Sequence, residues 1–80
     1  MKVNFEFVGM LRKFNNWQNR STFELPDGCT AKEAMAKFEA EAGFAKEFGF
    51  ITIGGKKHAD NDVTLKDGDT VKIFPKSFGG

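Results

Sequence analysis

Apolar and polar residues alternate near the start of the chain, which predicts two strands. Val3, Phe5 and Phe7 are separated by polar residues, the period of a strand with one buried face. A second alternation covers residues 22–25 and ends at a Pro-Asp-Gly turn. The intervening stretch, residues 9–19, is rich in Asn and Gln and predicts a large loop. Two strands joined in this way form an antiparallel hairpin.

A helix is predicted directly after this hairpin. Thr30 and Glu33 match a capping box, in which the hydroxyl and the carboxylate each accept a hydrogen bond from a free N–H at the helix start. Gly43 is placed to end the helix. One apolar stripe at helical spacing contains Ala31, Met35, Phe38 and Ala42.

The second half of the chain predicts three more strands and a core-filling loop. Gly54 and Gly55 form a tight hairpin turn that requires positive φ at both positions. A turn at residues 67–69 precedes the last strand, in which Val71 and Ile73 face inward. The predicted strands are residues 50–53, 56–58 and 70–74, and the loop is anchored by Val63 and Leu65.

The order of these elements predicts the fold. A hairpin followed by a crossover helix places that helix across one face of the sheet. Placing the last strand parallel to the first avoids crossing connections. The sequence therefore predicts an α+β, β-grasp domain over residues 1–74, with a mixed sheet of four to five strands and one main helix. Residues 75–80 are predicted to be a flexible C-terminal tail.

The predicted tail carries the candidate chemistry. Pro75 lacks an N–H and is expected to end the last strand, and six extended residues reach roughly 20 Å beyond it. Gly79 and Gly80 have no side-chain bulk, which suits a stalk that enters an active site. The free carboxylate of Gly80 reacts poorly with nucleophiles until ATP converts it to an acyl-adenylate, from which a sulfur or amine nucleophile can displace AMP. Val71 and Ile73 share the buried face of the last strand, so Phe74 is expected on the opposite, solvent face. There it would serve either as a docking residue or as a cover for the strand end.

A resemblance to a known family rests on the run from Leu65 to Pro75 and on the closing glycine pair. The run Leu-Lys-Asp-Gly-Asp-Thr-Val-Lys-Ile-Phe-Pro resembles the ending of the MoaD/ThiS family of sulfur carriers, which are ubiquitin-like proteins. The chain departs from the family ending at Lys76, Ser77 and Phe78. Leu11 and Arg12 make it more similar to molybdopterin-synthase small subunits than to thiamine-pathway carriers.

The resemblance implies a carrier rather than an enzyme. An E1-like adenylyltransferase, using ATP and Mg²⁺, would adenylate Gly80, and sulfur transfer would then give a thiocarboxylate for cofactor biosynthesis, most similar to the molybdopterin branch. Gly79 would provide passage into a large synthase subunit, and Phe74, Pro75 and Phe78 would contact the partner. The chain itself would hold no stable cofactor.

Composition and charge favour a cytoplasmic protein without a polyanion partner. The formal net charge is +1, from 12 basic and 11 acidic residues, so neither nucleic acid nor an anionic membrane is expected. A lone Cys29 cannot form an intramolecular disulfide. The N-terminal segment is too polar for a signal peptide, and no apolar stretch is long enough to span a membrane.

Three other groups of residues suggest a function, but a purely structural role explains each of them more simply. Residues 11–20 interleave basic and aromatic side chains, as in single-strand nucleic-acid binders, but are interpreted as a loop with Phe14 and Trp17 folded onto the domain. His58 has acidic neighbours at 60, 62, 67 and 69 but lacks metal-site spacing. Cys29 precedes a helix start, yet neither a His nor a second Cys is near it in sequence, so no metal site and no nucleophile are expected.

Two other functions remain open at this stage. The first is a protein modifier joined through Gly80 to lysines of target proteins. The second is a β-grasp interaction module whose Gly-Gly ending is accidental. No catalytic triad or carboxylate pair is present in the sequence.

Overall fold

The computed structural model describes residues 1–58 and 63–76. Several residues named in the sequence analysis lie outside these ranges: Asp60, Asp62, Ser77, Phe78, Gly79 and Gly80. The described elements, in chain order, are β1 (Lys2–Phe7), the 3₁₀-helix η1 (Gly9–Asn15), β2 (Arg20–Glu24), α1 (Ala31–Glu39), α2 (Phe44–Glu47), β3 (Phe48–Ile53), β4 (Lys56–His58) and β5 (Thr70–Pro75).

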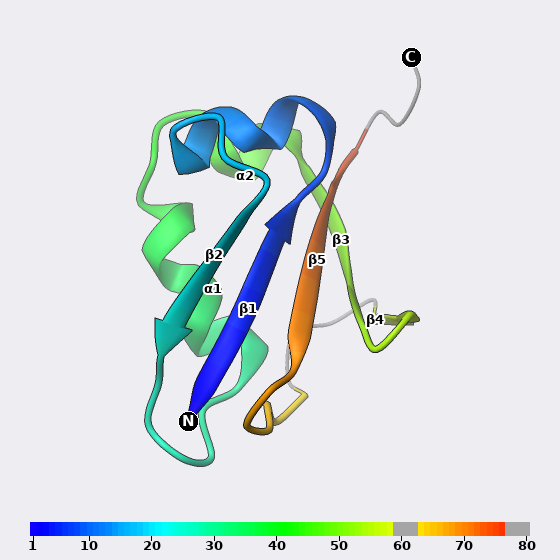
Figure 1. Cartoon of the computed structure of the whole chain (residues 1–80). Helices are drawn as coiled ribbons and strands as arrows, with labels where there is room; N and C mark the ends of the chain where they lie inside the picture. Colours follow the sequence, from blue (N-terminus) through cyan, green and yellow to red (C-terminus); the bar gives the residue numbers. More distant parts are fainter. Residues whose placement is uncertain (59–62, 77–80) are drawn as a thin grey trace.

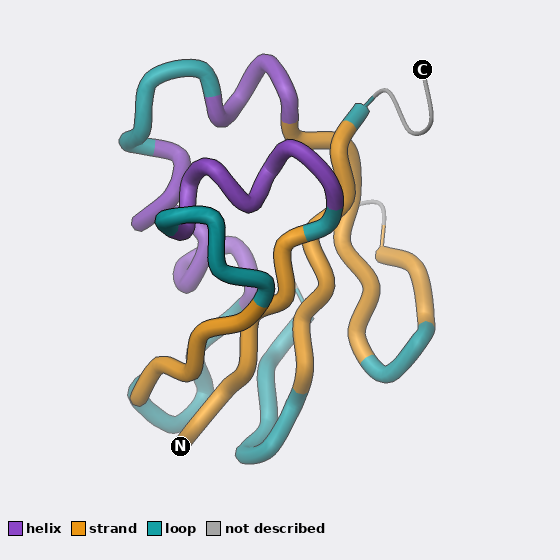
Figure 2. The backbone as a smooth tube through the Cα atoms, turned by 45° about the horizontal axis from the view of Figure 1, so that its top comes forward, coloured by secondary structure: helices purple, strands orange, loops and turns teal. Residues whose placement is uncertain are grey.

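The five strands form one mixed sheet in the order β2-β1-β5-β3-β4. β1 pairs antiparallel with β2 and parallel with β5, and β3 pairs antiparallel with both β5 and β4. Figure 1 shows α1 against one face of the sheet and η1 and α2 at the end toward which β1 and β5 point. Figure 2 shows β5 running between β1 and β3. The predicted α+β, ubiquitin-like β-grasp fold is therefore confirmed.

The core lies between α1 and the inner face of the sheet. Alternate residues of the strands point inward, as the sequence pattern predicts, and the inward positions of β1 and β5 are almost completely buried. The buried hydrophobic residues are Val3, Phe5, Phe7, Leu11, Leu25, Ala31, Ala34, Met35, Phe38, Phe44, Ile51, Leu65, Val71 and Ile73.

Helix α1 begins as predicted and ends earlier than predicted. The Thr30 hydroxyl accepts a hydrogen bond from the Glu33 N–H (3.2 Å), and a Glu33 carboxylate oxygen accepts one from the Thr30 N–H (2.9 Å). The helix ends at Glu39, so the prediction that Ala42 extends its buried stripe is wrong, because Ala42 is exposed. Gly43 does not end α1; its φ of 88° begins α2 and turns the buried Phe44 into the core.

The predicted loop after β1 contains a 3₁₀-helix. Leu11 of η1 is buried, and the Phe14 ring packs edge-on against Phe44 at 5.3 Å between centroids. Trp17 is 56% exposed, so the prediction that it folds onto the domain is wrong. The cause is the backbone: Asn16 and Trp17 both adopt left-handed conformations, with φ of 52° and 63°, which return the chain to β2 and leave the indole outside.

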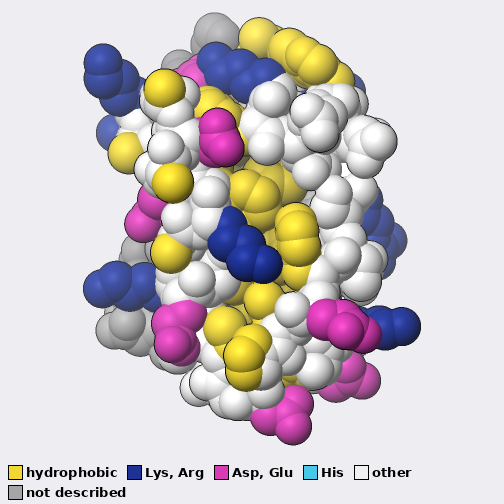
Figure 3. Space-filling view, turned by 90° about the vertical axis from the view of Figure 1, so that its left-hand side faces the viewer, with side chains coloured by type: hydrophobic (Ala, Val, Ile, Leu, Met, Phe, Trp, Pro, Cys, Tyr) yellow, Lys and Arg dark blue, Asp and Glu magenta, His cyan; other side chains and the backbone are white. Residues whose placement is uncertain are grey.

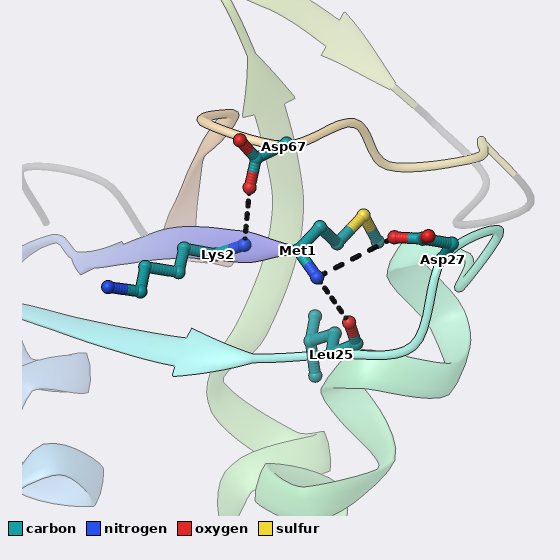
Figure 4. A network of polar contacts seen from close by, with 5 residues as sticks. All are labelled: Met1, Lys2, Leu25, Asp27 and Asp67. Atoms are coloured by element: carbon teal, nitrogen blue, oxygen red, sulfur yellow. Dashed lines mark hydrogen bonds and ion pairs between the residues drawn. The ribbon is translucent and has the colours of Figure 1, made fainter.

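The connections around the start of β1 are tied by backbone hydrogen bonds (Figure 4). The Met1 amino group donates to the Leu25 carbonyl oxygen at 2.9 Å and lies 3.6 Å from an Asp27 carboxylate oxygen. The Lys2 N–H donates to the Asp67 carboxylate at 2.7 Å. The predicted turn at residues 67–69 therefore fixes the entry of β5 beside β1.

The loop before that turn reaches the core as predicted. Leu65 is buried, and Val63 packs against the core at its margin. The Val63 carbonyl oxygen accepts a hydrogen bond from the Ala31 N–H (2.9 Å), and the Leu65 N–H donates to the Cys29 carbonyl oxygen (2.9 Å). This segment thus closes the core at the N-terminal end of α1.

Candidate functional site

The end of β5 is held by the first residues of β3. Phe48 pairs with Pro75, and the Lys76 N–H donates to the Glu47 carbonyl oxygen at 2.8 Å. Pro75 and Lys76, which the sequence assigned to the flexible tail, are therefore held by the domain, the first by β3 and the second by the last residue of α2. The pairing of Pro75 was missed because β3 begins at Phe48 rather than at the predicted residue 50. The predicted tail beyond Lys76 lies outside the described residues and stays a prediction.

A β-bulge at Gly49 allows this close approach. The pairing register shifts between Phe48 and Phe50, so Gly49 is the extra residue of β3 opposite β5. A Cβ atom at Gly49 would lie 2.7 Å from the Pro75 carbonyl oxygen and 2.9 Å from the Lys76 nitrogen. Only glycine fits there. A lone Gly beside a strand pattern is a signal for such a bulge, so the local sequence does contain a signal for Gly49.

Two aromatic rings lie on the outer face of the sheet next to this end of β5. Phe74 and Phe50 are cross-strand partners, and their rings stack at 4.7 Å between centroids with 6° between their planes. The Lys57 ammonium lies 4.5 Å from the Phe50 centroid. Phe74 is half-buried, whereas Val71 and Ile73 are fully buried, so the predicted facing of Phe74 is confirmed. We call Phe50, Lys57 and Phe74 the outer aromatic patch.

The charges beside the outer aromatic patch are mostly positive. On the same face, the Glu6 carboxylate is shared by two cations, with Arg20 at 3.8 Å and Lys72 at 3.9 Å. Lys57 adds a third cation at the patch itself. Glu6 neutralises one of these three charges, and Glu24 lies at the far end of the same face, so the part of the outer face beside the patch is net positive.

The two short helices brace the residues that hold β5. Lys13 of η1 forms an ion pair with Glu47 of α2 at 2.6 Å, and Phe44 stacks on Phe48 at 5.5 Å. The Val8 N–H, just before η1, donates to the Ile73 carbonyl oxygen at 3.0 Å. The point at which the chain leaves the sheet is therefore a fixed part of the domain.

The structure describes part of the acidic group near His58, and it describes Cys29. Within residues 1–58 and 63–76, no group of three His, Cys, Asp or Glu side chains is arranged to hold a metal ion. Asp67 and Asp69 instead accept backbone hydrogen bonds from Lys2 and Lys66. Burial raises the pKa of the Cys29 thiol, which disfavours the thiolate. No helix in this part of the chain is long and apolar enough to cross a membrane.

The geometry defines a ubiquitin-like β-grasp domain with a braced C-terminal strand, and solved structures from three organisms are similar to it. A Pyrococcus furiosus protein assigned as molybdopterin converting factor subunit 1 matches with a TM-score of 0.77 and 23% identity, over 96% of this chain and 99% of that chain. A chain in the structure of the complex of subunits 1 and 2 of molybdopterin-converting factor from Helicobacter pylori matches with a TM-score of 0.69 and 22% identity, over 100% of this chain and 100% of that chain. SAMP1 from Haloferax volcanii matches with a TM-score of 0.77 and 15% identity, over 100% of this chain and 100% of that chain.

These likenesses confirm the predicted resemblance at the level of the fold. No protein-family model matches the chain. No curated protein matches it significantly. The structural neighbours are molybdopterin converting factor subunits and a ubiquitin-like protein, and the identities are too low to carry more than the shared architecture.

Proposed function

We propose that this chain is a sulfur carrier that reacts through the carboxylate of Gly80. The observation that supports the proposal is the fixed end of β5, where Gly49 admits the backbone of Pro75 and Glu47 holds Lys76. Residues 77–80 follow this fixed point, and two of them are glycines. Such a segment is narrow enough to deliver its carboxylate into the active site of another protein.

The proposed chemistry needs an activating enzyme. An E1-like adenylyltransferase binds ATP and Mg²⁺, a Gly80 carboxylate oxygen attacks the α-phosphorus, and pyrophosphate leaves. Sulfide (HS⁻) then attacks the carbonyl carbon, and AMP and a proton leave, which gives the thiocarboxylate. This product donates its sulfur to a cofactor precursor, most similar to the molybdopterin branch. The chain supplies the carboxylate and a docking surface, Gly79 passes through the partner's channel, and catalysis belongs to the partners.

The outer aromatic patch is the proposed docking surface. Aromatic side chains are enriched in the centres of protein interfaces, and Phe74 lies one residue before the fixed Pro75. Phe78 is proposed to contact the same partner. The complex of subunits 1 and 2 described for the Helicobacter pylori factor supports a large synthase subunit as one partner. The positive outer face favours acidic side chains on that partner.

A pyrophosphate-exchange assay tests this function. With a candidate E1-like enzyme, labelled pyrophosphate is expected to enter ATP only when the chain is present, because exchange requires reversible adenylation of Gly80. Deleting Gly79 and Gly80 is expected to abolish exchange and leave unfolding unchanged. A protein modifier would show the same exchange but accumulate lysine-linked conjugates in cells. An interaction module would support no exchange, and deletion of the two glycines would leave its function in cells intact.

A further inference from the structure

Strand β2 leaves one edge of the sheet open. It is the terminal strand in the order β2-β1-β5-β3-β4. Leu25 and Met1 exchange both of their backbone hydrogen bonds. In an antiparallel ladder, the residues whose N–H and C=O point to the neighbouring strand alternate with residues that point away. The N–H and C=O groups of Arg20, Thr22 and Glu24 therefore point away from β1, and no described strand pairs with them.

The side chains of these three residues carry complementary charges. Arg20 and Glu24 lie two residues to either side of Thr22, and all three are exposed. Arg20 contacts Glu6 only at 3.8 Å, and Glu6 also has Lys72 at 3.9 Å. Glu24 forms no ion pair with any described residue. Glu24 lies opposite Lys2 of β1 without an ion pair between them, so the edge presents a positive and a negative charge at equal distances from its centre.

We propose that β2 pairs with β2 of a second copy of this chain, antiparallel about a twofold axis at Thr22. In this register Thr22 lies opposite Thr22 of the second copy, and all outward N–H and C=O groups of the three residues form ladder hydrogen bonds. Arg20 lies opposite Glu24 of the second copy, and Glu24 lies opposite Arg20 of the second copy. Opposite charges at directly opposed positions stabilise a strand pair, whereas like charges destabilise it.

The inner face of β2 also favours a second copy of this chain as the partner. Phe23 is half-buried, with its ring edge-on to Phe5 at 5.4 Å, and the Lys37 ammonium lies 4.9 Å from its centroid. Figure 3 shows hydrophobic side chains gathered on this side of the molecule, with a basic side chain across them. In the proposed register Ser21 of the second copy lies opposite Phe23 and covers part of the exposed ring.

Several registers of the β2–β2 pairing would keep each side chain on its present face of the sheet, and the charges favour one of them. A shift of two residues, the smallest that keeps Phe23 on the inner face, places Thr22 opposite Glu24 or opposite Arg20. Either shift removes both charge pairs, and one of them also places Pro26, which has no N–H, in the ladder. Equal spacing of Arg20 and Glu24 about Thr22 is therefore the feature that specifies self-pairing.

The pairing leaves the proposed carrier site open. β1 separates β2 from β5, so the outer aromatic patch is not covered, and the two β5 strands point in opposite directions. The inference does not depend on the proposed sulfur chemistry. The interface is small, and small interfaces belong to weak, concentration-dependent complexes.

Sedimentation velocity from micromolar to millimolar concentration tests the pairing. The mass is expected to rise from 8.9 kDa toward twice that value. R20E and E24R are each expected to raise the dissociation constant about tenfold, since each turns both charge pairs into repulsive ones. The double variant R20E/E24R is expected to restore the dimer. A mixture of R20E and E24R chains is expected to dimerise better than either chain alone.

Amide hydrogen exchange gives a residue-level readout on the parent chain. With rising concentration, exchange at Thr22 and Glu24 is expected to slow, while exchange at Ser21 and Phe23, whose N–H groups already face β1, stays constant. A chain that remains monomeric at millimolar concentration overturns the proposal and leaves the edge for a strand of another protein. A dimer that neither charge reversal weakens overturns β2 as its interface.

Discussion

A Cβ atom at Gly49 would lie 2.7 Å from the carbonyl oxygen of Pro75, so the end of β5 can lie against β3 only because residue 49 has no side chain. This contact fixes the point at which the chain leaves the sheet. Gly49 lies more than twenty residues from Pro75 in sequence, so this contact joins two distant segments of the chain.

Gly49→Ala is expected to lower the free energy of unfolding by about 1–3 kcal/mol, because the added methyl group overlaps backbone atoms that cannot rotate away. It is also expected to shift the amide resonance of Lys76 more than those in β1. Chemical denaturation and a two-dimensional amide spectrum measure both effects. Gly54→Asn serves as the control: nothing lies within 4 Å of that position, and Asn tolerates its positive φ. Equal effects of both variants would contradict the account.

Phe74→Ala is expected to weaken binding to the activating enzyme at least about tenfold, as truncation of a central aromatic anchor does. The domain is expected to lose only about 1–2 kcal/mol of stability, because the ring is half-buried and loses one stacking partner. Titration calorimetry measures the binding. Phe23→Ala is the matched control, a half-buried ring at the far edge of the sheet. If both variants bind alike, the outer aromatic patch is not the docking surface.

The capping box predicts a specific pH dependence. Hydrogen bonds from the Thr30 backbone N–H and then from its hydroxyl lower the pKa of Glu33 below its ordinary value of 4.5. The folded state therefore favours the ionised Glu33 carboxylate. Its contribution to the free energy of unfolding is fully present above pH 4.5 and is lost as the pH falls through the lower pKa of the folded state. Thermal unfolding over that range is expected to depend less on pH in Glu33→Gln. An unchanged pH dependence would contradict the assigned contact.

The loop that contains Leu65 is predicted to be part of the core. Leu65→Ala removes a side chain that is only 2% exposed and is expected to cost about 2–4 kcal/mol. Val63→Ala, at the margin of the core, is expected to cost about 1 kcal/mol. Denaturant titration of both variants decides the matter, and equal costs would mean that the loop does not fill the core as the structure shows.

The strands and the start of α1 were predictable from local patterns. Alternation in β1 and β5, the capping box at Thr30 and the positive-φ pair at Gly54 and Gly55 are properties of neighbouring residues, and all are present. The features that were missed depend on contacts between distant segments. Leu11 is buried, and Phe14 reaches Phe44, which stabilises a helical turn where the local sequence indicates a loop.

The candidate site was predictable in part. Parity placed Phe74 outward, and the composition of the chain end indicated the proposed chemistry. The partner ring of Phe50, the cation of Lys57 and the bulge at Gly49 required the β3–β5 register. That register follows from the packing of α2 and the early start of β3, neither of which has a strong local signal.

The carrier function is tested most directly by intact-protein mass spectrometry after incubation with a candidate E1-like enzyme, ATP, Mg²⁺ and a sulfur source. The account predicts a mass gain equal to the replacement of one oxygen by sulfur, located at Gly80 by fragmentation and absent from a chain that lacks Gly80. A C-terminus that stays unmodified with every cognate activating enzyme would contradict it.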